Sequence, residues 1–166
     1  MAEPEQFLED GFHPIDIVEH LAEHREWDFD RIGDDQIAMA VEGQWRTYSI
    51  ILEWSEFEET LRLTCTFEMD PSAAQLSAIF ETLNLVNDQC WLGTFTWWNE
   101  QKLMVFRYAL VQSGGHIASA EQIDTMIRAA VKNAERYYPA FQLAAYGDHS
   151  PEQAFQVAIA EAYGHA

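Results

Sequence analysis

The chain has 166 residues, 48% of them hydrophobic, so it is long enough and apolar enough to fold around a core rather than remain disordered. Nine Lys and Arg stand against 28 Asp and Glu, and the resulting net charge of −19 disfavours binding to nucleic acid or to anionic membranes. The excess of acid either keeps the domain soluble or forms a surface for a basic partner.

Residues 1–12 are acidic and lack a basic region followed by an apolar run, so we expect a flexible acidic N-terminus and no signal peptide. No stretch reaches 18 apolar residues, so we expect no membrane span. The two cysteines, Cys65 and Cys90, are far apart and lack the spacing of metal ligands. The sequence therefore predicts a cytoplasmic protein that holds no metal or other cofactor.

The first half of the chain predicts one helix followed by a run of strands. Pro14 suits the first turn of a helix that ends near Arg25 and carries one apolar side. The hydrophobic period then changes to two, which predicts strands near residues 27–30, 37–41, 45–54 and 61–69. The last of these alternates most clearly and predicts a sheet with one buried face and one hydrated face.

The second half predicts a further helix from about Asp70 to Cys90, followed by strands near residues 94–98 and 103–111. Ser119 then caps a long helix, which Pro139 should end or kink near Tyr137-Tyr138. A last helix is expected from Pro151 to about Tyr163.

The order of these elements and the short turns between strands indicate an α+β fold. We expect an antiparallel sheet of five to six strands with flanking helices, in a single domain over residues 13–163.

One motif resembles a catalytic site. His20, Glu23 and His24 fit the H-x-x-E-H pattern, in which two histidines four apart on a helix share a zinc ion and the glutamate acts as a base. The helical projection places both histidines on the polar side of the helix, away from a shielded cavity. We therefore interpret the motif as a solvated helix face and expect no catalytic residues and no bound metal.

Two tryptophans are candidate protein-binding residues. Alternation places Trp98 on the opposite face of its strand from Phe95 and Trp97, and it places Trp45 opposite Tyr48 and its neighbours. Large aromatics on the second face of a sheet indicate that this face is covered, either by a helix of the same chain or by another molecule.

Four segments together resemble the YbjN family: His13-Pro14-Ile15-Asp16-Ile17-Val18-Glu19, Gln44-Trp45-Arg46-Thr47-Tyr48, Phe67-Glu68-Met69-Asp70 and Phe95-Thr96-Trp97-Trp98. The likeness spans about residues 12–163. The family is described as bacterial sensory-transduction regulators, and its fold is similar to that of type III secretion chaperones. The resemblance implies a chaperone-like fold with an extra C-terminal helix, and it supplies no catalytic residues. Such chaperones are often dimeric, so a homodimer is one state open to this chain.

The leading hypothesis is a non-enzymatic protein-binding module, chaperone-like or regulatory, that binds an unidentified protein through Trp45 and Trp98. Two alternatives stay open. One is a zinc-dependent hydrolase that uses His20, Glu23 and His24, and the other is a structural subunit of a larger assembly.

Overall fold

The computed structural model describes residues 13–147 and 150–164, and the predicted flexible segment 1–12 lies outside this range. The elements follow the predicted order, with ends that differ by a few residues and with one added 3-10 turn. They are α2 (Pro14–His24), β1 (Asp28–Arg31), β2 (Gln36–Glu42), β3 (Thr47–Ser55), β4 (Thr60–Glu68), η1 (Ala73–Gln75), α3 (Leu76–Gln89), β5 (Thr94–Trp98), β6 (Leu103–Val111), α4 (Ala120–Tyr146) and α5 (Pro151–Gly164).

Six strands form one antiparallel sheet in the order β1-β2-β3-β4-β6-β5. The first four strands are consecutive hairpins, because short turns bring sequence neighbours together as antiparallel pairs. The chain then passes through α3 to the far edge, and β6 returns between β5 and β4. The predicted α+β class and antiparallel sheet are confirmed, and the number of strands is six.

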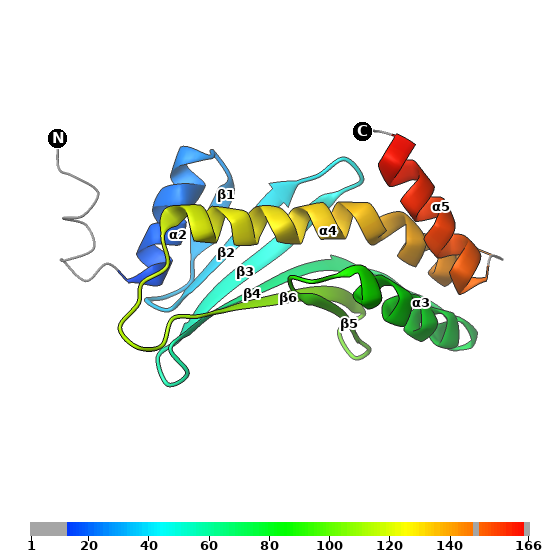
Figure 1. Ribbon diagram of the computed structural model, residues 1–166, viewed down its shortest axis with the longest axis horizontal. Helices are drawn as coiled ribbons and strands as arrows, with labels where there is room; N and C mark the ends of the chain where they lie inside the picture. The colour runs from blue at the N-terminus through cyan, green and yellow to red at the C-terminus, as the bar shows by residue number, and fades with distance from the viewer. Residues whose placement is uncertain (1–12, 148–149, 165–166) are drawn as a thin grey trace.

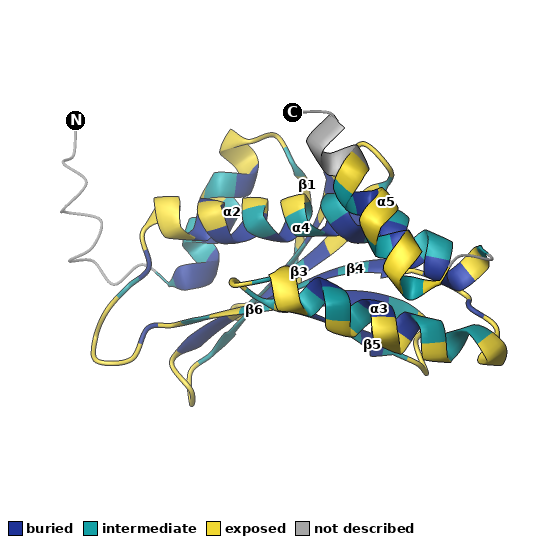
Figure 2. Ribbon diagram, turned by 45° about the vertical axis from the view of Figure 1, so that its right-hand side comes forward, coloured by how far each residue is buried: buried dark blue, intermediate teal, exposed yellow. Residues whose placement is uncertain are grey.

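Helices α2, α3 and α4 pack on one face of the sheet, α5 packs on α3 and α4, and the outer sides of the helices are exposed (Figures 1 and 2). The side chains that point toward the helices are buried, as in β4, where Leu61, Leu63, Cys65 and Phe67 alternate with polar residues. This alternation is the pattern that the sequence predicted, and burial of these apolar side chains is the main force that joins the two layers.

The 27-residue helix α4 extends along most of the molecule (Figure 1). It begins with a capping box, in which Ser119 Oγ accepts the N–H of Gln122 and the Gln122 side chain accepts the N–H of Ser119. Of the two effects expected of Pro139, an end or a kink, the end is wrong, because α4 continues to Tyr146. Proline removes a backbone hydrogen bond, but the turn that follows buries Ala140 and Phe141, and this burial offsets the loss.

Helix α3 packs beside β5, which is an edge strand of the sheet. The Asn87 side chain donates to the carbonyl oxygen of Phe95 over 3.0 Å and accepts the N–H of Phe95 over 2.8 Å. These two bonds occupy the backbone groups that a further strand would need at this position. Asn87 therefore blocks strand addition to β5 at Phe95.

Candidate functional site

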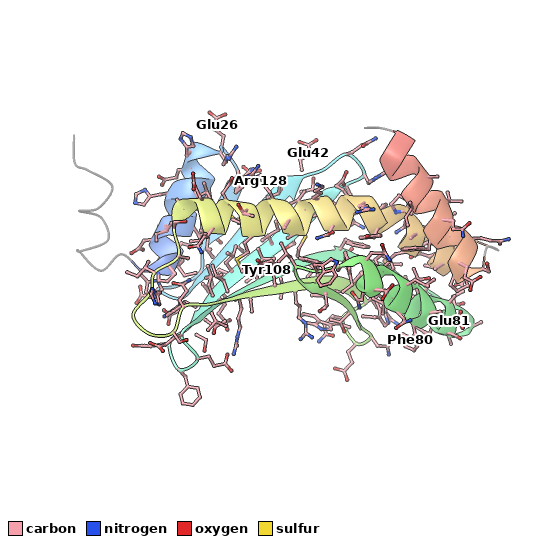
Figure 3. The ribbon with its side chains drawn as sticks, in the orientation of Figure 1. Glu26, Glu42, Phe80, Glu81, Tyr108 and Arg128 are labelled. Atoms are coloured by element: carbon pink, nitrogen blue, oxygen red, sulfur yellow. The ribbon has the colours of Figure 1, made fainter. Side chains whose placement is uncertain are left out.

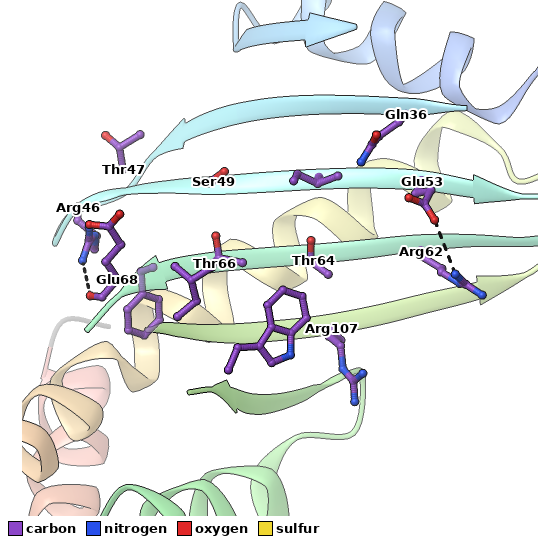
Figure 4. Close-up of a pocket in the computed structure, with 14 residues that line it drawn as sticks. Gln36, Arg46, Thr47, Ser49, Glu53, Arg62, Thr64, Thr66, Glu68 and Arg107 are labelled. Atoms are coloured by element: carbon purple, nitrogen blue, oxygen red, sulfur yellow. Dashed lines mark hydrogen bonds and ion pairs between the residues drawn. The ribbon is translucent and has the colours of Figure 1, made fainter. Parts of the chain in front are cut away.

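Across residues 13–147 and 150–164, no segment packs over the face of the sheet that points away from the helices. We call it the open sheet face, and Figure 4 looks onto it with helices behind the strands. Its side chains are those that alternate with the core positions: Asp28, Asp30, Gln36, Ala38, Ala40, Glu42, Thr47, Ser49, Ile51, Glu53, Ser55, Thr60, Arg62, Thr64, Thr66, Glu68, Thr94, Thr96, Trp98, Leu103, Val105, Arg107, Ala109 and Val111.

A hollow of about 810 Å³ lies on the open sheet face. Short hydroxyl side chains form much of its floor: Thr47, Ser49, Thr64 and Thr66. Ile51, Leu103 and Trp98 add apolar surface, and charged side chains come from Arg46, Arg62, Arg107, Glu53 and Glu68. A floor of small side chains beside apolar and charged groups can accept side chains from another molecule.

Trp98 lies on the open sheet face, as the alternation with Phe95 and Trp97 predicted. Phe95 and Trp97 are buried on the helix side, whereas Trp98 is partly buried and lines the hollow. By register Trp98 pairs with Leu103, so Val105 is its diagonal neighbour on the same face. Val105 has no exposed surface. The side chains of the open sheet face therefore enclose a small apolar centre of their own around Val105.

Trp45 lies on the other side of the sheet, so the expectation that it opposes Tyr48 is wrong. The indole stacks on Tyr138 of α4 with ring centroids 6.5 Å apart, and its side chain remains 44% exposed. The reason is that β3 begins at Thr47, and the alternation of a strand does not extend into the preceding turn. The structure does not bring Trp45 and Trp98 together, so the two residues cannot form one contact patch.

Glu135 of α4 holds the turn that carries Trp45. Its carboxylate accepts the Tyr48 hydroxyl over 2.5 Å, the Gln44 N–H over 2.8 Å and the Trp45 N–H over 3.2 Å. Gly43 must lack a side chain, because a Cβ there would lie 2.7 Å from Tyr48 Cε2 and would also collide with the Glu135 carboxylate. The position of Trp45 is thus fixed by contacts within the chain.

Two of the arginines in the hollow are held by other groups of the chain. Arg62 forms ion pairs with Glu58 and, over 3.7 Å, with Glu53. Arg46 donates to the carbonyl oxygen of Glu68 over 3.1 Å and lies over the ring of Phe67. Arg107 projects from β6 on the same face (Figure 4).

The comparison with protein families decides the identity of the chain. The family YbjN, described as "Putative bacterial sensory transduction regulator", matches residues 14–143. The chain belongs to the YbjN family. The match runs from the start of α2 into α4 and ends before α5, so the C-terminal helix lies beyond it. The family resemblance read from the sequence is confirmed, and the family description is that of a regulator rather than of an enzyme.

Two solved structures are similar to this YbjN family chain. The crystal structure of YbjN from E. coli has 14% sequence identity and a TM-score of 0.49, and the similarity covers 91% of this chain and 92% of that one. The structure of the HopA1–SchA chaperone–effector complex has 12% identity and a TM-score of 0.47, with 80% of this chain and 94% of that chain covered. The comparison with curated proteins gave no match.

The H-x-x-E-H motif lies on the outer surface of α2 in this YbjN family member. His20, Glu23 and His24 are exposed, and His20 Nδ1 lies 3.9 Å from the Glu23 carboxylate. In the part of the chain that the structure describes, no three His, Cys, Asp or Glu side chains gather as metal ligands. Nothing in this geometry supports the zinc-hydrolase alternative.

Several exposed aromatic residues were missed by the sequence analysis. Trp91 is 95% exposed between α3 and β5, and Phe57 is 98% exposed between β3 and β4. Phe80 is 54% exposed on the outer side of α3, next to Glu81 (Figure 3). Trp91 and Phe57 lie in connections, where no hydrophobic period indicates which side chains face solvent.

Neither cysteine has the properties of a nucleophile. Burial raises the pKa of the Cys65 thiol to about 12, and burial also raises the pKa of Cys90. Both thiols therefore stay protonated near neutral pH, and only the thiolate form is reactive.

None of the described helices is both long enough and apolar enough to cross a membrane.

Proposed function

We propose that this YbjN family chain is a non-enzymatic protein-binding module and that its partner binds on the open sheet face around Trp98. The observation that carries the proposal is the hollow of about 810 Å³ beside a partly buried tryptophan, on a face that no described helix covers. A regulatory or chaperone-like role then follows from the bound partner, in keeping with the family description as a regulator.

Trp98 has the features of an interface anchor. Tryptophan is enriched among residues that dominate binding energy, because a large rigid ring buries much apolar surface with little loss of conformational freedom. Leu103 and Ile51 extend the apolar surface beside it, and Thr and Ser hydroxyls supply hydrogen-bonding groups around them. Apolar surface beside polar groups that remain hydrated is the arrangement of many non-obligate interfaces.

The edges of the sheet favour binding on its face rather than addition of a strand. At β5, Asn87 occupies the N–H and C=O groups of Phe95. At the opposite edge, β1 is four residues long and carries Asp28 and Asp30. Short, charged or occupied edges oppose pairing with another chain.

Trp45 is a second candidate for contact with a partner protein. Its exposed indole lies over α4, on the opposite side of the sheet from Trp98. If both tryptophans bind protein, they bind different partners or different parts of one large partner.

Affinity capture from a bacterial lysate tests the proposal with four baits: the wild-type chain and the variants Trp98→Thr, Trp45→Ala and Trp91→Ala. Threonine suits position 98 because the two preceding residues on the same face of β5, Thr94 and Thr96, are threonines. We expect at least one captured protein to be lost with Trp98→Thr and retained with Trp91→Ala, while circular dichroism shows both variants to be folded at the temperature of the capture. Size-exclusion chromatography with light scattering then shows whether the same substitution dissociates a homodimer. If Trp98→Thr captures the same proteins as the wild-type chain, the proposal is refuted.

A further inference from the structure

Cations are scarce in this chain, and a third of them line one hollow. Of the nine Lys and Arg, Arg46, Arg62 and Arg107 lie around the hollow on the open sheet face, together with two of the 28 acidic residues, Glu53 and Glu68. The lining therefore carries a formal charge of +1, three positive against two negative, in a molecule whose net charge is −19. The lining of the hollow is locally positive, whereas the open sheet face beyond it carries the acids Asp28, Asp30 and Glu42 and the chain as a whole is strongly acidic.

Arg107 is the arginine whose charge is left without a partner. The other six arginines all have a polar or ring contact: Arg25 and Arg128 with Asp124, Arg31 with Asp16 and Glu19, Arg62 with Glu53 and Glu58, Arg46 with the Glu68 carbonyl, and Arg136 over the Tyr137 ring. Among the described residues, Arg107 has no hydrogen bond, ion pair or ring contact.

The sheet register explains why Arg107 is left unpaired. Its direct cross-strand neighbours are Thr64 and Thr94, which carry no charge, and its diagonal neighbour on β4 is Arg62. The one unpaired acid of the lining, Glu68, lies four residues along β4 from Thr64, which is roughly 14 Å at the rise of a strand. The guanidinium is therefore presented beside a second arginine and out of reach of an acid on its own face.

We propose that the open sheet face binds a partner segment in which an acidic side chain stands next to apolar ones. The carboxylate pairs with Arg107, and the apolar side chains pack on Trp98, Leu103 and Ile51. This inference rests on the proposed function and names the chemistry of its partner. Planar guanidinium groups bind carboxylates through two parallel hydrogen bonds, which fixes the orientation of the segment as well as adding affinity.

The charge of the rest of the chain makes this arrangement selective. An acidic segment is repelled by a molecule with net charge −19 and is attracted most where cations gather, and three of the nine cations lie around the hollow. A basic partner, which the overall composition suggested, would meet Arg107 and Arg62 at this site and would bind elsewhere on the molecule. The hollow therefore favours an acidic partner, whereas the overall composition favours a basic one.

Selection from a phage library of random 12-residue peptides in 0.15 M NaCl tests this inference. Clones are selected on the immobilised wild-type chain and then sorted by whether binding survives Trp98→Thr. We expect the Trp98-dependent clones to be enriched in Asp and Glu and in apolar residues relative to the input library. On the Arg107→Glu variant, the Trp98-dependent clones should instead be enriched in Lys and Arg.

Lys132→Glu is the matched control, because Lys132 is an exposed cation of α4 on the other side of the sheet. This variant should select the same acidic peptides as the wild-type chain. For one synthetic peptide from the wild-type selection, Arg107→Gln should weaken binding about tenfold by fluorescence anisotropy, and Lys132→Gln should change it less than twofold.

The outcomes separate this inference from the proposed function. Trp98-dependent peptides with no acidic preference, or with a preference that Arg107→Glu leaves unchanged, would overturn the inference and leave the proposed binding face standing. Peptides that all bind independently of Trp98 would overturn both.

Discussion

At the scale of single residues, the core buries two weak acids. Burial raises the pKa of the Cys65 thiol to about 12, and burial together with the hydrogen bond to Glu135 raises the pKa of the Tyr48 hydroxyl well above its ordinary value. Both groups keep their protons in the folded state at pH values where an unfolded chain would lose them. Alkaline pH therefore favours the unfolded state, because only that state can release these protons.

We predict that Cys65→Ala reduces the loss of stability between pH 8 and pH 10. An unfolded thiol titrates near pH 8.5, so the thiol of Cys65 should cost the wild-type chain about 2 kcal/mol of unfolding free energy at pH 10. Urea unfolding at both pH values measures this difference. Cys65→Ala also removes core packing, so the comparison is the change with pH within each variant. If the free energy of unfolding changes by the same amount between pH 8 and pH 10 in the wild type and in Cys65→Ala, the thiol of Cys65 is not the cause of the loss.

The positions of some side chains could be predicted from the sequence, and those of others could not. Trp98 could be placed on the open sheet face because it lies within a strand, where alternation with Phe95 and Trp97 is obligatory. Trp45 could not be placed, because it lies in a turn whose position is set by Glu135, a residue 90 positions later in the chain. The sequence also could not predict that Arg107 lacks a partner, because the register between strands decides which residues lie next to it.

At the scale of elements, the turn between β2 and β3 is attached to α4 through one carboxylate. Glu135 accepts hydrogen bonds from Tyr48, Gln44 and Trp45. Hydrogen bonds to a charged acceptor are stronger than neutral ones, and the Tyr48 hydroxyl is buried where water cannot replace a lost partner.

We predict that Glu135→Ala lowers the free energy of unfolding by about 3 kcal/mol, because it leaves three donors without their acceptor. Glu135→Gln should cost less, since an amide oxygen still accepts one of these bonds. Lys132→Ala, at an exposed position one turn earlier in α4, should change stability by less than about 0.5 kcal/mol. Equal effects of Glu135→Ala and Lys132→Ala in urea unfolding would show that the turn is held by other contacts.

Helix α4 shows why the boundaries of elements were harder to predict than their order. The capping residues Ser119 and Gln122 are local signals, and they placed the start of the helix correctly. Its end was not predicted, because Pro139 is a local signal to stop and the opposing signal is tertiary. Phe141 and Ala144 bury their side chains in the core, and only the packed fold shows this.

At the scale of the whole molecule, the domain has two faces of different character. The helix side encloses a continuous hydrophobic core, and the open sheet face combines threonines, a partly buried tryptophan and the exposed arginine Arg107. The order of strands and helices, the antiparallel sheet and the family could all be predicted from hydrophobic period, turns and four short segments. Which face the helices cover is a property of the assembled layers, and so is the contrast between a locally positive hollow and an acidic chain.

The claim that a partner protein occupies the open sheet face is tested most directly by photo-crosslinking in bacterial cells. Benzoylphenylalanine is placed at Ser49, which is exposed on the open sheet face, or at Lys132, which is exposed on α4. We predict a discrete crosslinked protein from position 49, lost when Trp98→Thr is added, and no such product from position 132. Crosslinks from position 132 alone, or a position-49 product that persists with Trp98→Thr, would contradict this account.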